Sequence, residues 1–233
     1  MKEILIFRHA AGEGPGYFAR FLDRHKLPHR LIRIDQNEPV PEHIADSSAL
    51  VLMGGPMSVN DPLPWIPPLL RLIVQTMEAD RPVLVHCVGG QLLSKALGGS
   101  VAPNGTREIG WFPVRRAAGA AADDWLGPLP REFEVFHWHG ETFTIPRGAD
   151  RILTNDTCAN QGFVTGKALG LQCHVEMLPT MVHNWARIGH AEISRPSPTV
   201  QNAGQMAEAL EERIDRLHQV ADTIYTRWLQ GLD

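Results

Sequence analysis

The sequence has few cysteines and no long apolar run, and these absences exclude several classes of protein. Its three cysteines form no CxxC pair, so neither a disulfide framework nor a cysteine-based zinc site is indicated. A reducing cytoplasm is therefore the expected location. No apolar stretch approaches the roughly 20 residues that a transmembrane helix needs. The opening segment MKEILIFRHA is typical of a first strand, because its apolar run is too short for a signal peptide.

The chain also lacks a strong excess of charge of either sign. Its formal net charge is −4, which provides no electrostatic reason to expect nucleic acid or an anionic membrane as a partner. With 233 residues, of which 43% are hydrophobic and 21% charged, it is long enough to bury one large core.

Short apolar runs alternate with helical patterns through the first hundred residues. The runs contain almost no polar residues, which indicates strands buried on both faces in a parallel sheet covered by helices. The alternation of strand and helix predicts an α/β fold. Strands are predicted at residues 4–7, 31–34, 49–53 and 83–86, and helices at 16–25, 69–79 and 91–97.

The second half has shorter, closely spaced strand patterns, which predict a smaller antiparallel sheet beside the mostly parallel central one. These strands are expected at residues 110–114, 133–138, 151–154, 162–165 and 168–173. The Ala/Gly stretch 117–122 is predicted to be a surface loop. A long helix is predicted over 203–229. We expect one domain over 1–195 and, over 196–233, a helical extension that packs on the same domain.

One strand pattern ends at a cysteine. The run of residues 83–86 stops at Cys87, two glycines follow, and a helix pattern begins. A sharp strand–turn–helix of this kind would expose the thiol at the carboxyl edge of the sheet, where open α/β folds bind ligands. The helix N-terminus would favour the thiolate, and its free N–H groups could stabilise an oxyanion. Gly89 would let the helix begin close to the strand.

A base and a residue to orient it follow the last apolar strand. His174 and Glu176 are two residues apart, so in an extended chain their side chains point to the same side. The carboxylate can then hold the imidazole tautomer, as the acid does in a Ser-His-Asp triad. The same alternation places Cys173 on the opposite side, in the core.

Simpler interpretations exist for the single residues. Taken alone, Cys87 is better interpreted as a buried core thiol than as a nucleophile. Its combination with His174 and Glu176 is what favours a catalytic role. His86 is interpreted as structural, because alternation points it away from the thiol. His137 and His139 could face one another along a strand, but no third ligand is expected nearby, so we predict no metal.

These motifs resemble those of the class I glutamine amidotransferases, particularly the domain attached to GMP synthetases and its stand-alone relatives. Residues 87–91 (CVGGQ) match the family's G-x-C-x-G-H-Q, and residues 172–176 (QCHVE) match its Q-x-H-P-E. The GGP of residues 54–56, the EIG of 108–110 and the HGE of 139–141 resemble three further family motifs in the same order. The resemblance spans about residues 1–190 and implies a flavodoxin-like α/β fold.

The resemblance also implies roles for individual residues. Cys87 would attack the γ-carbonyl of glutamine, His174 would transfer the proton, and Glu176 would orient the histidine. The backbone N–H groups of Gly55 and Val88 would form the oxyanion hole. The remaining contacts, to the α-amino-acid end of the substrate, would come from Gln91 and from backbone groups of Gly140 and Glu141. No cofactor is expected.

Two positions depart from the family pattern and leave the substrate open. Val85 stands where the family has glycine, and Gly90 stands where it has histidine. The first interpretation is a glutamine-hydrolysing enzyme whose ammonia acceptor lies on a separate synthase subunit. The second is a hydrolase of γ-glutamyl amides or peptides that needs no acceptor, and the third is a non-catalytic regulatory subunit. A homo-oligomer is compatible with each of them.

Overall fold

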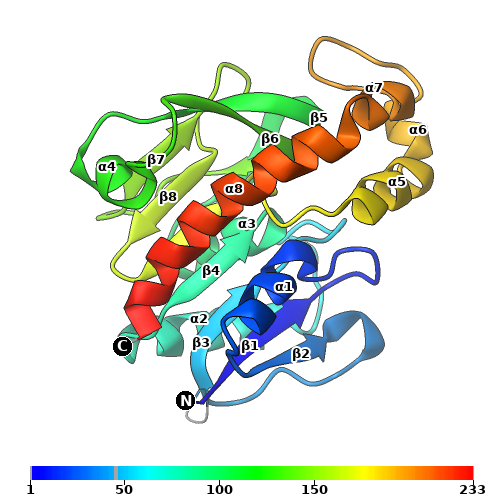
Figure 1. The fold of residues 1–233 in the computed structure, drawn as a ribbon. Coiled ribbons are helices and arrows are strands. Elements are labelled where there is room, and N and C mark those ends of the chain that lie inside the picture. The colour runs from blue at the N-terminus through cyan, green and yellow to red at the C-terminus, as the bar shows by residue number, and fades with distance from the viewer. Residues whose placement is uncertain (1, 45–46, 233) are drawn as a thin grey trace.

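The chain folds around a mixed β-sheet of nine strands in the order β2-β1-β3-β4-β9-β8-β7-β5-β6 (Figure 1). The computed structural model describes residues 2–44 and 47–232. The strands are β1 (Glu3–Arg8), β2 (His29–Arg33), β3 (Ser47–Leu52), β4 (Val83–His86), β5 (Val101–Arg116), β6 (Glu132–Phe143), β7 (Asp150–Thr154), β8 (Gly162–Thr165) and β9 (Ala168–Leu171). The helices are α1 (Gly16–Arg24), α2 (Ile66–Glu78), α3 (Val88–Ala96), α4 (Ala120–Leu126), α5 (Pro179–Ile188), α6 (His190–Ile193), α7 (Ala203–Ala207) and α8 (Leu210–Leu229), with 3₁₀ turns η1 (Ile34–Gln36) and η2 (Gln230–Leu232).

The strands from β2 to β9 in this order form the parallel half of the sheet. Every residue of β4 and of β9 is buried, as their uninterrupted apolar sequences predict. Helices α1 and α8 cover one face of this half, and α2 and α3 cover the other, so each face has its own hydrophobic core (Figure 1). The predicted α/β architecture is confirmed.

The remaining strands are antiparallel. Strand β8 pairs with β9 and β7, and the long strand β5 pairs with β7 and β6. The predicted antiparallel section is therefore present, and it continues the parallel half within one sheet. The β5–β6 pair extends over the edge where β4 and β9 end, and its residues become part of the candidate site.

The C-terminal helix predicted over residues 203–229 is divided into α7 and α8. The break lies at Glu208, whose backbone is extended and ends α7, and at Ala209, whose φ of 49° is left-handed. Helix α7 is held against β5, because the indole N–H of Trp111 donates to the Met206 carbonyl at 3.0 Å. Helix α8 then runs diagonally across the sheet past α1 (Figure 1). Its buried side chains are Leu210, Ile214, Leu217, Val220, Ala221, Ile224, Tyr225 and Trp228.

The predicted surface loop over 117–122 is wrong in its second half, because α4 begins at Ala120. Alanine has the highest helix propensity, and the helix buries Trp125 and Leu126 in the core. Helices α5 and α6 lie in a stretch for which the sequence predicted no element. Among the described helices, none combines the length and apolar character required to cross a bilayer.

The start of α3 lies very close to two strands. A Cβ atom added to Gly89 would lie 2.6 Å from the Leu52 carbonyl oxygen of β3, as expected for a glycine that lets the helix approach the strand. A Cβ added to Gly90 would lie 2.5 Å from the Leu171 carbonyl oxygen of β9. Gly90 therefore faces the sheet and not the cleft described below, and its small size permits close packing between α3 and β9.

We predict that Gly90→Ala destabilises the protein by about 1–3 kcal/mol, because the new methyl group must displace backbone. Gly204→Ala is the matched control, since Gly204 is an exposed helical glycine whose added Cβ would come no closer than 3.3 Å to a neighbour. The control should be neutral or slightly stabilising. Urea unfolding measures both. Equal stabilities for the Gly90→Ala variant and the parent would contradict this account of Gly90.

Candidate active site

Cys87 lies between β4 and α3 in a strained conformation. Its φ of 51° and ψ of −113° fall in a region that non-glycine residues rarely adopt. Its N–H donates to the Leu171 carbonyl at 2.8 Å, which continues the pairing of β4 with β9 by one residue. The side chain is almost fully buried, and it lines a cleft of about 660 Å³. This geometry is that of a nucleophile elbow.

His174 and Glu176 follow β9, directly beside this elbow. The His174 backbone pairs with Phe136 of β6 through hydrogen bonds of 2.8 and 3.3 Å, which hold it at the edge of the sheet. The His174 Nδ1–H donates to Glu176 Oε1 at 2.6 Å, which is the contact expected from their spacing. Cys173 points the other way and is fully buried.

The thiol and the imidazole flank Gly54. A Cβ atom added to Gly54 would lie 3.2 Å from His174 Cε1 and 3.5 Å from Cys87 Cβ. In the described part of the chain, His174 Nε2 has no hydrogen-bond partner. The Nδ1–H bond to Glu176 therefore leaves Nε2 as the nitrogen available for proton transfer.

Charges around the imidazole favour its protonated form. Burial lowers the pKa of His174, but the Glu176 carboxylate and the Cys87 sulfur raise it well above its ordinary value. Burial raises the pKa of Glu176, but His174 and then His86 lower it to about 2. A buried imidazolium beside a carboxylate is the arrangement that stabilises a neighbouring thiolate.

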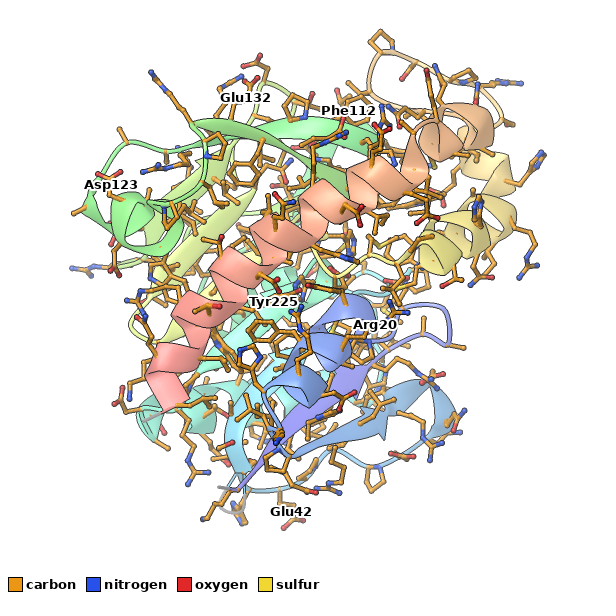
Figure 2. The ribbon with its side chains drawn as sticks, viewed as in Figure 1. Arg20, Glu42, Phe112, Asp123, Glu132 and Tyr225 are labelled. Atoms are coloured by element: carbon orange, nitrogen blue, oxygen red, sulfur yellow. The ribbon has the colours of Figure 1, made fainter. Side chains whose placement is uncertain are left out.

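His86 lies on the opposite side of the sheet from the thiol, as its alternation predicted. It approaches Glu176 all the same, because its Nε2 is 3.7 Å from Glu176 Oε2 and 3.3 Å from the Tyr225 hydroxyl. Burial lowers the pKa of His86. Tyr225 points inward from α8 in Figure 2, so the C-terminal helix supports the carboxylate from behind.

The expected oxyanion groups also face the cleft. Gly55 and Val88 both line it, and in the described structure neither backbone N–H donates a hydrogen bond within the chain. The Val88 N–H is at the first position of α3, where helical N–H groups have no intrahelical acceptor. Both N–H groups are therefore without an acceptor from the described part of the chain.

The expected substrate contacts lie along one wall of the cleft. Gln91 lines it, and its amide donates to Gln172 at 3.3 Å; the Gln172 amide in turn contacts the Cys87 sulfur at 3.7 Å. Gly140 and Glu141 line the same cleft. The Glu141 carboxylate accepts a hydrogen bond from the Ser58 hydroxyl at 3.1 Å, which ties this wall to the loop that carries Gly55.

The structure adds residues that the sequence analysis missed. The Trp138 carbonyl is 3.8 Å from the Cys87 sulfur, and the Trp185 ring packs edge-on against His174 at 4.8 Å between centroids. The Glu13 carboxylate lies beside Gly54, close enough that a Cβ there would clash with it. Burial raises the pKa of Glu13 to about 7, against a lowering by His174 and a further rise from Glu176. Glu13 lies in a loop after β1, and no local pattern marks it.

The expectation that no third ligand lies near His137 and His139 is wrong. The two histidines and Glu108 are all buried, and one ligand atom from each lies within 4.8 Å of the others. Strand β5 supplies the carboxylate, directly opposite His139 in the register with β6.

The comparisons with known proteins identify the family and the fold. The family model "Glutamine amidotransferase class-I" matches residues 21–184. A glutamine amidotransferase crystal structure from Methylobacillus flagellatus superposes with a TM-score of 0.96 at 42% identity, covering 100% of this chain and 96% of that one. A glutamine amidotransferase structure from Thermotoga maritima gives a TM-score of 0.87 at 27% identity, over 97% of each chain.

Relatives in sequence include one protein that the match covers for the most part and others that it covers only in part. The glutamine amidotransferase-like protein YfeJ of Salmonella typhimurium is 24% identical over 192 residues, 80% of each chain. The glutamine-hydrolysing GMP synthase of Thermomicrobium roseum is 31% identical over 152 residues, which are 64% of this chain but only 27% of the synthase. The chain thus spans about a quarter of the GMP synthases that it matches. By its matched domain and its fold, this protein belongs to the class I glutamine amidotransferase family.

Proposed function

We propose that this chain is a cysteine-dependent hydrolase of the glutamine γ-amide, with Cys87, His174 and Glu176 as its triad. One observation supports this proposal most strongly. The strained Cys87, which lines the cleft, lies beside the imidazole of His174, and the Nδ1 of that imidazole is hydrogen-bonded to the buried carboxylate of Glu176. Five matched motifs and the membership in the family support the same assignment.

In the proposed reaction the Cys87 thiolate attacks the γ-carbon, forming a C–S bond and an oxyanion. The N–H groups of Gly55 and Val88 donate to that oxygen. The imidazolium of His174 gives its Nε2 proton to the nitrogen, the C–N bond breaks, and ammonia leaves a γ-glutamyl thioester. Water then attacks the thioester while His174 takes its proton, and expulsion of the thiolate releases glutamate.

Substrate contacts follow from the walls of the cleft. Gln91 would bind the α-amino-acid end, with backbone groups of Gly140 and Glu141. Glu176 would stabilise the imidazolium that forms during the cycle. We also propose that residues 196–233 belong functionally to the same domain, because Tyr225 of α8 reaches the residues behind the triad.

An amidotransferase needs an acceptor for its ammonia. The GMP synthases that match this chain are about four times longer than the matched segment, so we propose a separate synthase subunit as the acceptor-bearing partner. Association with that subunit would place the ammonia acceptor near the cleft.

A second candidate is hydrolysis of γ-glutamyl amides that carry a larger amine. The cleft of about 660 Å³ is within the range of sites that hold drug-sized ligands and exceeds what one amino acid needs. The Glu13 carboxyl lies beside Cys87 and His174, and no ion pair holds it in the described structure. A carboxylate in that place would bind the ammonium of an amine leaving group.

The triad predicts that Cys87→Ala abolishes glutamate release from glutamine, with a loss on the order of 10⁴-fold or more in kcat. A glutamine-like diazoketone should add to the parent chain at Cys87, as mass spectrometry of peptides would show. Cys158→Ser is the matched control, because Cys158 is buried outside the cleft. Full activity in Cys87→Ala would refute the proposed nucleophile.

The two candidate substrates are separated by a panel that pairs glutamine with γ-glutamyl derivatives of a diamine and of a neutral amine. If Glu13 binds a cationic leaving group, Glu13→Gln raises KM for the diamine derivative by about tenfold and leaves KM for glutamine and the neutral derivative nearly unchanged. Equal turnover of all three by the parent and the variant removes the second candidate. Turnover of none by the parent removes both.

The half-buried carboxyl of Glu13 predicts a pH-dependent loss of stability. Folding raises the pKa of Glu13 from 4.5 to about 7. The contribution of the protonated carboxyl to the free energy of unfolding is therefore at its full value below pH 4.5, and it is lost as the pH rises through 7. Between pH 5 and pH 8 the parent should lose on the order of 1–3 kcal/mol more than Glu13→Gln does. Urea unfolding at both pH values tests this. The control is Glu211→Gln, which removes a carboxylate on the exposed side of α8, far from the cleft. If the free energy of unfolding of the parent and of Glu13→Gln depends on pH in the same way, the prediction is contradicted.

A further inference from the structure

A buried cluster of three potential ligands lies behind the cleft, on the β5–β6 pair. His137 and His139 are two residues apart on β6, so their side chains point to the same face. Glu108 of β5 is paired with His139 in the register. All three side chains are at most 6% exposed. The sheet geometry therefore gathers two imidazoles and a carboxylate in the interior.

Backbone carbonyls decide the tautomer of each histidine. His137 Nε2 lies 3.3 Å from the Phe112 carbonyl, and His139 Nδ1 lies 3.1 Å from the Glu141 carbonyl. A carbonyl oxygen only accepts, so each of these nitrogens carries a hydrogen. In a neutral ring the other nitrogen then presents a lone pair. Those nitrogens, His137 Nδ1 and His139 Nε2, are buried and have no hydrogen-bond partner in the described structure.

The carboxylate of Glu108 is held in place from its other side. Its two oxygens accept hydrogen bonds from the side-chain amides of Asn155 at 2.6 Å and Gln161 at 2.7 Å. Its Oε2 is 3.1 Å from His139 Nε2. In this tautomer the Nε2 lone pair of His139 would face a carboxylate oxygen, which is repulsive unless a proton on Nε2 or a bound cation lies between them.

We propose that Glu108, His137 and His139 bind a divalent transition-metal ion of the zinc class, through His137 Nδ1, His139 Nε2 and a Glu108 oxygen. Two imidazoles and one carboxylate are an established ligand set for zinc and for its first-row neighbours. One potential ligand atom of each residue already lies within 4.8 Å of the others. The carbonyls on the histidines and the amides on the carboxylate are the outer contacts that metal ligands usually have.

The ion has a route to this site and a structural consequence there. His139 lines the catalytic cleft, so a hydrated ion can reach the cluster from that side. Once bound, it would join β5 to β6 under the segment that presents Trp138, whose carbonyl is 3.8 Å from the Cys87 sulfur. This site is independent of the proposed glutamine chemistry, since none of its ligands takes part in the triad.

The test uses the full chain with Cys87→Ala, because a thiolate beside His174 would itself bind zinc. Bound metal is first removed with a chelator, and the protein is then incubated with Zn²⁺ and desalted. The zinc that remains bound is quantified by inductively coupled plasma mass spectrometry. We expect about one equivalent per chain, visible d–d absorption when Co²⁺ is used, and a Tm raised by several degrees at zinc concentrations well above Kd.

Two further changes, His137→Gln and Glu108→Gln, should each abolish the retained zinc and the cobalt absorption. His9→Gln should keep both. His9 is a matched control because it too is buried, contacts a backbone carbonyl through Nδ1 and leaves Nε2 without a partner. Circular dichroism verifies that each variant is folded.

The proposal is overturned if the Cys87→Ala chain retains no zinc and shows no rise in Tm. That result would mean that a proton on His139, and not a metal ion, neutralises the charge of the Glu108 carboxylate. Because this measurement needs no change within the cluster, it decides the question even if the cluster variants do not fold. Zinc retained equally by the folded His137→Gln variant would also overturn it, since binding would then be adventitious and outside the cluster.

Discussion

The parallel pairing of β4 with β9 is the constraint on which the rest of the site depends. These strands are far apart in the sequence, yet the register sets His86 beside Leu171, and the hydrogen bond from the Cys87 N–H to the Leu171 carbonyl extends it into the elbow. A shift by one residue would turn every side chain to the other face. The same pairing brings the chain that follows β9, with His174, to the thiol.

The burial of Glu176 determines how strongly its charge acts on His174. Glu176 is almost inaccessible to water, so its charge acts on His174 through a medium of low dielectric constant and keeps the imidazole protonated. The carboxylate has a second neighbour in His86, which in turn contacts Tyr225 of α8. The last helix of the chain thereby reaches the surroundings of Glu176, although it lies on the face of the sheet opposite α3.

The β5–β6 pair links the cleft that Cys87 lines to the cluster of Glu108, His137 and His139. One of its faces presents the Trp138 carbonyl to Cys87, while His137, His139 and Glu108 meet in the interior beside it. Polar groups at this depth are costly unless each has a partner. His137 Nδ1 is buried without a hydrogen-bond partner in the described structure, and His139 Nε2 faces the Glu108 carboxylate at 3.1 Å, so a bound cation would neutralise the carboxylate and satisfy both nitrogens.

Local sequence determined the elements, and tertiary contacts decided what they do. Apolar runs predicted β4 and β8 to the residue, because a strand buried on both faces consists mainly of apolar side chains; the one polar residue in each, His86 and Thr165, is the last of its strand. The spacing of His174 and Glu176 determined their contact, since it depends on two residues of extended chain. The break at Ala209, the start of α4, the approach of Glu13 to the thiol and the arrival of Glu108 beside His139 were not predictable in this way. Each depends on which distant segment packs alongside, and periodicity along the chain carries no information about that partner.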